Sequence, residues 1–296
     1  ITAAAFTTAA QGAPEGQQGR YLGVTVSGMT VALFTGVPVG SWLAGSIGWR
    51  AAFWVIAAIG TMAAVGLLVT APSVAGSEPA PLRERLTALR GFAVLRLVGV
   101  TFLAASGGLM FYSYLSVYVA DVSLNTSFRL LSILLFVVGL AGLGGALLAG
   151  YLTDSWGPKR TLRTVIGGHA IALALLAALF FTGWGNVIVL GVLIAVWSVF
   201  AWGLNPPIQG SILSAAGPSA GMSALGLNIS GLYLGTGVAG AVGGGILSLA
   251  GIGWVPVAAT VLMLASFLCT PSSRAARAGN ASDDIPTKSL QRTREP

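Results

Sequence analysis

Long stretches without charged side chains dominate the pattern of hydrophobic and polar positions along the chain. No Asp, Glu, Lys or Arg occurs in residues 164–273, and shorter uncharged runs separate Arg20 from Arg50 and Arg129 from Asp154. A membrane-spanning helix needs roughly 20 apolar residues, because it must rise through about 30 Å of hydrocarbon while its backbone groups bond internally. The pattern therefore predicts eight complete spanning helices, over residues 22–45, 51–71, 97–120, 130–152, 163–182, 187–205, 224–249 and 252–270.

The longest uncharged run is divided into separate spans by residues 183–186, by residues 205–221 with their prolines, and by residues 250–253. A membrane β-barrel would require alternation of apolar and polar residues, which runs such as 171–181 do not show. Residues 1–10 are also apolar and lack the basic start and the cleavage site of a signal peptide. We therefore expect them to end a further span, and we expect the first helices of the protein to precede this sequence. The predicted fold class is an all-α polytopic membrane protein.

Composition agrees with this fold class and argues against a soluble domain, a disulfide-rich or metal-binding protein, and an enzyme. Hydrophobic residues make up 55% and charged residues 8% of the chain, against about 25% charged in an average soluble domain. Cys269 is the only cysteine, so no disulfide framework and no thiolate metal site can form. Paired carboxylates, His/Cys/Asp clusters, Ser/His/Asp sets and phosphate-binding glycine loops are missing from the sequence. We expect no enzyme, no metal and no cofactor.

The formal net charge of +7 follows from the predicted topology. When residues 11–21 are placed inside the cell and the spans alternate, the outer side holds only Arg50 and Arg129. The inner loops and the tail hold the remaining basic residues, which are Arg20, Arg83, Arg85, Arg90, Arg96, Lys159, Arg160, Arg163, Arg274, Arg277, Lys288, Arg292 and Arg294. An excess of basic residues marks the cytoplasmic side, so we predict a plasma (inner) membrane protein with a cytoplasmic C-terminus. Because these residues are dispersed over several loops, we expect no nucleic-acid partner.

Two segments lie outside the predicted spans. Residues 72–96 begin with prolines and continue with a helical pattern in which Leu82, Leu86 and Leu89 share a stripe. That pattern suits an amphipathic helix at the cytoplasmic membrane surface or a linker helix between two bundles. Residues 271–296 are polar and aperiodic, which is typical of a disordered tail.

Three motifs resemble those of the major facilitator superfamily of membrane transporters. Residues 36–40 (Gly-Val-Pro-Val-Gly), with the Gly-Trp-Arg-Ala-Ala-Phe of residues 48–53, are similar to the fifth-helix motif of its antiporters. Residues 150–160 (Gly-Tyr-Leu-Thr-Asp-Ser-Trp-Gly-Pro-Lys-Arg) are similar to its cytoplasmic loop motif, in the copy between helices eight and nine. Ser155 and Pro158 replace two usually basic positions there. Residues 224–228, with the glycines at 235, 244 and 245, resemble helix eleven of the drug and sugar efflux branch, near arabinose and purine-nucleoside efflux permeases.

The resemblance implies a fold and a function. The fold would be the end of helix four to helix twelve of a major facilitator: residues 1–71 close the first bundle, 72–96 form the cytoplasmic central loop, 97–270 form the second bundle, and 271–296 the tail. The function would be secondary active export of small organic solutes such as drugs, sugars or nucleosides, by alternating access and proton antiport. The partners would be a small-molecule substrate, protons and the lipid bilayer, in a monomer. A sugar-like solute uniporter or importer is the alternative, and a channel or a non-transporting scaffold is a further one.

The glycines of the first motif permit two interpretations. Gly36 and Gly40 lie on one helix face, where they allow a neighbouring backbone to approach, and Pro38 removes a hydrogen bond and bends the helix. On one interpretation the two glycines serve ordinary small-residue packing. On the other, which the resemblance implies for the whole motif including Arg50, the bend seals the outer half of the bundle.

The loop motif also permits two interpretations. Gly150 and Gly157 allow a tight reversal, and Asp154 can accept hydrogen bonds from helix-end amides or pair with a basic residue. Lys159 and Arg160 would lie at head-group depth. The motif is then either an inner gate held by an ion pair or a turn with solvated charges that sets the topology.

Polar residues inside the spans are candidates for the substrate pathway. Ser106, Met110, Ser113 and Tyr114 share one face of the third predicted span, next to Tyr112, and Asn228 lies in the seventh. Transporters hold substrate at the midplane between facing helices. Packing or anchoring at the membrane surface is the alternative for the two tyrosines.

His169 is the one histidine, about a turn inside its span, so it suits proton coupling or a hydrogen bond to a neighbouring helix. The acidic residues all lie in loops, at span ends or in the tail: Glu15, Glu78, Glu84, Asp121, Asp154, Asp283, Asp284 and Glu295. A proton-driven carrier usually needs a buried carboxylate. We therefore expect the coupling carboxylate in the helices that precede this sequence.

Overall fold

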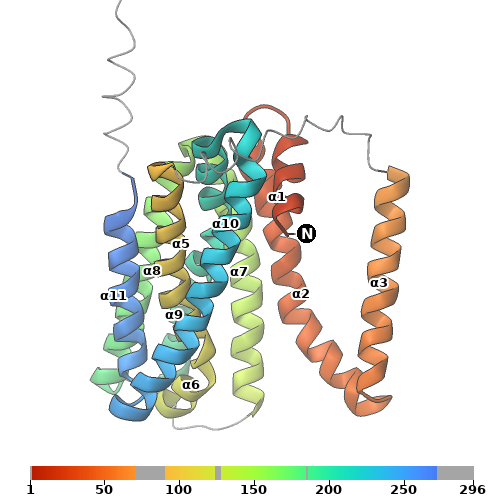
Figure 1. Cartoon of the computed structure of the whole chain (residues 1–296). Helices are drawn as coiled ribbons and strands as arrows, with labels where there is room; N and C mark the ends of the chain where they lie inside the picture. The colour runs from red at the N-terminus through yellow and green to blue at the C-terminus, as the bar shows by residue number, and fades with distance from the viewer. Residues whose placement is uncertain (1, 71–90, 124–127, 185, 272–296) are drawn as a thin grey trace, which may run out of the picture.

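The computed structural model describes residues 2–70, 91–123, 128–184 and 186–271, and these form a set of helices that run side by side (Figure 1). The helices are α1 (Thr2–Gln11), α2 (Gln18–Ser46), α3 (Trp49–Thr70), α5 (Phe92–Ser113), α6 (Leu115–Ser123), α7 (Phe128–Trp156), α8 (Pro158–Thr182), α9 (Val187–Gly203), α10 (Asn205–Ala250) and α11 (Trp254–Cys269). Strands are absent from the described residues, so the predicted all-α class is confirmed.

Six helical stretches among the described residues are long and apolar enough to cross a membrane. They are Trp49–Val69, Phe92–Ser113, Leu130–Trp156, Pro158–Thr182, Val187–Gly217 and Ala220–Ala250. Each coincides with a predicted span. The other two predicted spans, 22–45 and 252–270, are also helical, in α2 and in the shorter apolar helix α11.

The third predicted span differs from the structure at both ends. Its helix α5 begins at Phe92, so residues 92–96 belong to this helix and not to the predicted central loop. The helix ends at Ser113, because Tyr114 leaves helical geometry (φ −109°, ψ 13°), and α6 follows as a separate short helix. The stripe predicted for residues 82–90 lies outside the described residues, as does the predicted tail from residue 272.

The segment 205–221, predicted as a break between two spans, is mostly helical. Pro206 and Pro207 occupy the first turn of α10, where the missing N–H would have no helical partner in any case. The chain leaves helical geometry only at Gly217, with φ 73° and ψ 174°. The residue before a proline is disfavoured in the helix, and glycine tolerates positive φ, so Gly217 before Pro218 makes the turn.

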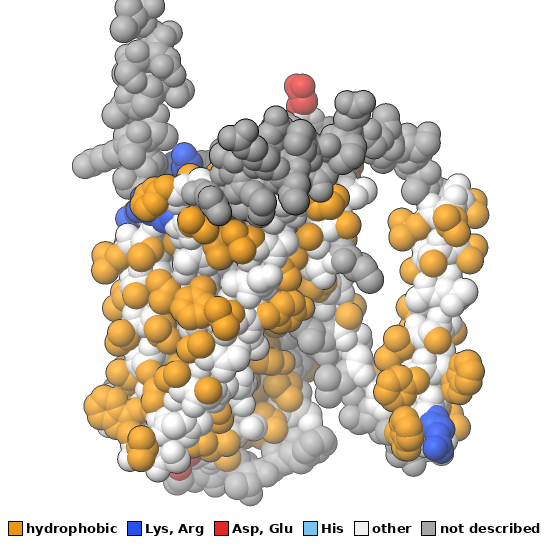
Figure 2. All heavy atoms as spheres, in the orientation of Figure 1, with side chains coloured by type: hydrophobic (Ala, Val, Ile, Leu, Met, Phe, Trp, Pro, Cys, Tyr) orange, Lys and Arg blue, Asp and Glu red, His pale blue; other side chains and the backbone are white. Residues whose placement is uncertain are grey.

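The basic residues gather at one end of the bundle, which we call the basic end. It carries the α1–α2 connection, the α7–α8 turn, the Gly217 break and the end of α11 (Figure 1), with Arg20, Arg96, Lys159, Arg160 and Arg163. Arg50 lies in the first turn of α3, at the opposite end of the bundle, where Figure 2 shows a blue patch. Most of the core lies among α5–α11, α1 and the first half of α2 also contribute buried residues to it, and α2 packs against α7. Helix α3 stands apart and contacts α2.

Candidate functional site

Asp154 joins two helices that are far apart in the sequence. It lies at the end of α7, and its Oδ1 accepts a hydrogen bond from the Gly19 backbone N–H at 2.6 Å, while its Oδ2 accepts one from the Arg20 N–H at 2.9 Å. The side chain is 8% exposed. The first N–H groups of a helix have no internal partner and carry its positive dipole end. Gln17 at the start of α2 provides no side-chain cap, so a carboxylate from α7 caps this helix instead.

The Arg20 side chain adds a weaker interaction to this cap. Its Nε lies 3.8 Å from Asp154 Oδ2, its side chain is 50% exposed, and its guanidinium stands 5.0 Å from the centre of the Tyr151 ring. Exposed pairs of this kind contribute little to stability, so the backbone bonds to Asp154 dominate. We call Asp154, Gly19 and Arg20 the clasp.

Small residues bring the backbones of α2 and α7 into contact beside the clasp. A Cβ on Gly19 would lie 2.5 Å from the Gly150 carbonyl oxygen, and a Cβ on Gly150 would lie 2.6 Å from the Gly19 oxygen. One turn further, a Cβ on Gly23 would lie 2.9 Å from the Ala146 oxygen. Gly19 and Gly23 are four residues apart in α2, and Ala146 and Gly150 are four apart in α7. This spacing places both residues of a helix on one face, where their small side chains permit the close approach. Any side chain at Gly19 or Gly150 would therefore separate the two helices.

The rest of the loop motif forms the turn into α8. Gly157 adopts φ 84°, and Pro158 starts α8. The Thr161 hydroxyl donates to the Leu152 carbonyl at 2.9 Å and so ties α8 back to α7. Lys159 is exposed, and Arg160 stands 5.1 Å from the centre of the Trp156 ring. The partner of Asp154 is therefore neither of the motif's own basic residues but Arg20.

Sequence reasoning proposed helix-end amides or a basic residue as partners of Asp154 without naming them. Gly19 and Arg20 belong to a segment 135 residues away. The available signal was a glycine followed by an arginine at the start of a predicted span, which many helices share.

The first motif lies elsewhere in the structure. Gly36, Pro38 and Gly40 are inside α2, and no described heavy atom comes within 4 Å of a Cβ placed on either glycine. Gly48 makes the α2–α3 turn with φ 102°, and Arg50 stands 4.8 Å from the centre of the Trp49 ring. These residues are not brought to the clasp.

The hydroxyls predicted for the substrate face of α5 are mostly used inside the protein. Ser106 is fully buried and donates to the Phe102 carbonyl at 2.8 Å, and Ser113 is exposed and donates to Leu109 at 2.8 Å. Tyr114 donates to the Gly240 carbonyl of α10 at 2.7 Å. Met110 is fully buried. Tyr112, half-buried, stacks on Trp197 of α9 with ring centroids 6.3 Å apart.

Asn228 is not brought level with these residues. Glycines of α10 follow α5 in parallel: a Cβ on Gly231 would meet Val98, and one on Gly243 would meet Tyr114. Asn228 precedes Gly231 by about one turn, so it lies nearer the basic end than Tyr112 does. Its side chain is 2% exposed, and its Oδ1 has no hydrogen-bond partner among the described residues.

His169 lies in an aromatic pocket between α5 and α9. It is 2% exposed, its ring lies 6.1 Å from the Trp197 ring, and a Cβ on Gly108 would lie 2.8 Å from its Cε1. Neither ring nitrogen has a hydrogen-bond partner among the described residues. The hydrogen bond to a neighbouring helix, one of the two predicted roles, is not made there.

Comparison with known proteins agrees with the motifs. The family model described as Major Facilitator Superfamily matches residues 1–228. The uncharacterized MFS-type transporter YbcL of Bacillus subtilis is 32% identical over 275 residues, covering 90% of this chain and 68% of YbcL. The inner membrane transport protein YdhP of Escherichia coli K12 is 28% identical over 269 residues, covering 90% and 67%.

A third relative is named for resistance to a drug. The chloramphenicol resistance protein of Streptomyces lividans is 35% identical over 156 residues, covering 51% of this chain and 40% of that protein. The family consists of transport proteins rather than enzymes. With its bundle of apolar helices, its loop motif and these relatives, the chain belongs to the major facilitator superfamily of multi-pass membrane transporters.

Proposed function

We propose that this protein exports small organic solutes by alternating access, with the clasp as its inner gate. The observation that carries the proposal is the capping of α2 by Asp154 of α7. In the proposed domain organisation, residues 1–71 belong to the first bundle and residues 97–270 to the second. Helices α2 and α7 then belong to different bundles, so the clasp holds the two bundles together at the basic end. The name of the chloramphenicol resistance protein supports export of a small organic solute.

Opening the basic end would require breaking the clasp. Hydrogen bonds that involve a charged group contribute about 1.5–3 kcal/mol each, so the two backbone bonds to Asp154 together favour the closed arrangement by about a hundredfold or more. Exchange between the two arrangements requires this difference to be small enough for substrate binding to offset it. The half-buried Tyr112, beside Trp197, is the α5 candidate that remains available for contact with substrate.

Transport into vesicles tests the proposal. The full-length protein, reconstituted into lipid vesicles, should take up radiolabelled chloramphenicol or arabinose with a rate that saturates and with counterflow driven by unlabelled solute. Counterflow requires a carrier that returns loaded, which a channel does not do. Uptake that rises linearly with concentration and shows no counterflow would contradict the proposal. Net transport into cells, driven by an inward gradient of the solute or of protons, would favour the importer alternative.

The orientation is the first prediction. We propose that the basic end faces the cytoplasm, because basic residues accumulate on that side. In a Cys269→Ser background, Ser155→Cys and Ser289→Cys should react with a membrane-impermeant maleimide only in inside-out vesicles, and Asn186→Cys only in intact cells. Ser155 is exposed near the clasp, and Asn186 caps α9 at the opposite end. Labelling of Ser155→Cys in intact cells would reverse the orientation.

The coupling of transport to protons is the second prediction. We propose proton antiport that does not use His169, because its buried ring packs against Gly108 and Trp197 and neither ring nitrogen has a hydrogen-bond partner among the described residues. His169→Gln should keep most of the substrate exchange that an imposed pH gradient drives in vesicles. Loss of the pH response with normal counterflow would instead assign proton coupling to His169.

A further inference from the structure

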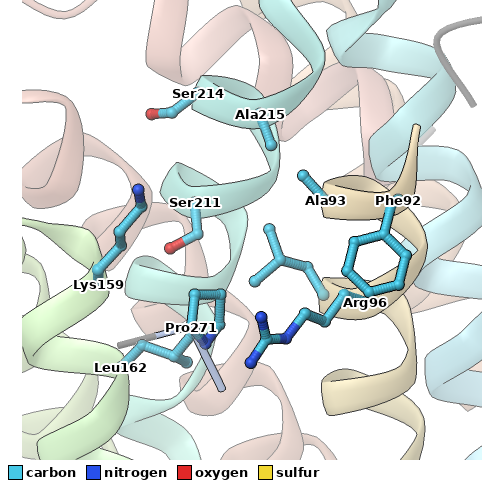
Figure 3. Close-up of a pocket in the computed structure, with 10 residues that line it drawn as sticks. Phe92, Ala93, Arg96, Lys159, Leu162, Ser211, Ser214, Ala215 and Pro271 are labelled. Carbon is cyan, nitrogen blue, oxygen red and sulfur yellow. The ribbon is translucent and has the colours of Figure 1, made fainter. Parts of the chain in front are cut away.

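A cavity of about 280 Å³ opens at the basic end, among α5, α8, α10 and Pro271, two residues beyond the end of α11 (Figure 3). It is a different site from the clasp and shares no residue with it. Its walls are mostly apolar, and two basic side chains and two hydroxyls face it. The lining residues are Phe92, Ala93, Arg96, Leu97, Lys159, Leu162, Ser211, Ser214, Ala215 and Pro271.

Arg96 is held in place by the end of α11. Its Nε donates to the Cys269 carbonyl at 2.6 Å, and its guanidinium also reaches the Thr270 carbonyl at 3.5 Å. Arg163 donates to the same Thr270 carbonyl at 3.3 Å. Cations at the C-terminal end of a helix complement its dipole. Arg96 therefore presents a fixed positive group at the cavity.

Lys159 supplies the second charge from the opposite side of the cavity (Figure 3). It lies in the first turn of α8 and is exposed. No carboxylate lines the cavity, and no described carboxylate pairs with Lys159 or Arg96. The cavity therefore presents two positive charges that face no carboxylate among the described residues.

The serine hydroxyls play a secondary part. Ser211 donates to the Pro207 carbonyl at 2.7 Å, and Ser214 donates to the Gly210 carbonyl at 2.8 Å. Both hydroxyl protons are thus used within α10, so the two cations determine which ligand charge the cavity accepts.

We propose that this cavity binds the phosphate headgroup of an anionic phospholipid. The phosphate would lie between Lys159 and Arg96, and the glycerol and the first acyl carbons would lie over the exposed lining residues Phe92, Ala93 and Ala215. A soluble phosphate would satisfy the cations but gain nothing from the apolar walls, whereas a lipid uses both. The position supports a lipid as well, because basic pockets between spanning helices at the cytoplasmic side suit anionic headgroups, and the large apolar side chain of Phe92 is 78% exposed beside it.

A lipid bound there would bridge α5, α8 and α10 and should stabilise the folded protein. A ligand that binds the native state and not the unfolded state raises its stability in proportion to the logarithm of ligand concentration. We expect dioleoyl-phosphatidylglycerol, added to the purified full-length protein in mild detergent, to raise the midpoint of thermal unfolding by about 3 °C or more. Dioleoyl-phosphatidylcholine, with the same chains and no net charge, should raise it much less.

Two variants and one control assign the effect to the cavity. Lys159→Gln should lose most of the shift that phosphatidylglycerol causes. Ala215→Trp should lose it too while keeping both cations, because Ala215 is an exposed lining residue and an indole there fills the space. Arg160→Gln removes the same charge from the neighbouring position, where the side chain packs on Trp156 and does not line the cavity. It should keep the shift.

Each result decides the matter. Equal loss in Lys159→Gln and Arg160→Gln would show general attraction of lipid to the basic end and overturn the site. A full shift in Ala215→Trp would overturn it as well. An equal shift with 20 mM inorganic phosphate in place of lipid would show that the cavity takes a soluble anion, which overturns the lipid assignment. Native mass spectrometry should show one retained phosphatidylglycerol that Lys159→Gln loses and Arg160→Gln keeps.

Discussion

Asp154→Asn is expected to slow solute counterflow in vesicles by about tenfold or more. The amide that replaces the carboxylate keeps one acceptor oxygen and places an NH₂ group against the second backbone N–H of α2, so one of the two bonds is lost and the other loses its charge. At about 1.5–3 kcal/mol for each charged hydrogen bond, this shifts the ratio of closed to open protein at the basic end by at least about tenfold. A carrier that rests open on one side completes fewer cycles.

Two controls separate the clasp from a general effect of charge. Arg20→Gln should slow counterflow much less than Asp154→Asn, because the Arg20 backbone N–H keeps its bond and only the exposed side chain, 3.8 Å away, is lost. Asp121→Asn removes a carboxylate of α6 that lies outside the clasp and should transport at the normal rate. Normal counterflow in Asp154→Asn would reduce Asp154 to a turn residue.

Gly150→Ala is expected to have an effect of similar size through sterics alone. Its Cβ would lie 2.6 Å from the Gly19 carbonyl oxygen, which is backbone and cannot rotate away. The helices must then separate beside the clasp and lengthen its hydrogen bonds. We expect counterflow to fall by about tenfold, and spin labels at Gln18 and Ser155 should report a greater distance between α2 and α7.

Gly144→Ala is the matched control for this substitution. Gly144 lies in the same helix, and nothing lies within 4 Å of its Cβ position. Both changes gain about 1 kcal/mol of intrinsic helix preference, so a difference between them reports the contact alone. The double variant Gly150→Ala/Asp154→Asn should show counterflow only a little slower than either single variant, because both changes weaken the same contact between α2 and α7. Fully additive losses, or a normal rate in Gly150→Ala, would contradict the role of this contact.

The sequence was sufficient for the helices because a membrane leaves few alternatives. Backbone groups in hydrocarbon must bond internally, so an uncharged run such as 130–152 has to be helical. The predicted ends were less accurate, since no hydrophobic boundary marks Tyr114, where α5 stops, or the proline-rich start of α10, which continues as helix. These ends depend on packing against neighbouring helices.

The sequence identified residues of the candidate site but not their hydrogen-bond partners, as Asp154 and Ser106 illustrate. Asp154 was singled out because residues 150–160 resemble the loop motif of the family, and helix-end amides were named as one kind of partner. Its actual donors at Gly19 and Arg20 come from a distant helix and follow only from the tertiary fold. Ser106 was predicted as a substrate-pathway hydroxyl, but in the structure that hydroxyl bonds to the carbonyl one turn earlier. Periodicity shows which way a side chain points and not whether its proton is already used.

The attachment of α11 has a practical consequence for observing this carrier one molecule at a time. Arg96 and Arg163 hold the end of α11 through carbonyl oxygens of Cys269 and Thr270, so the contact does not depend on which side chain stands at residue 269. The Cys269 thiol is exposed, and it is the only cysteine in the chain. A fluorophore attached there would sit on a fixed point beside α5 and α8, and energy transfer to a dye on α2 would follow the proposed opening and closing of a single transporter in real time.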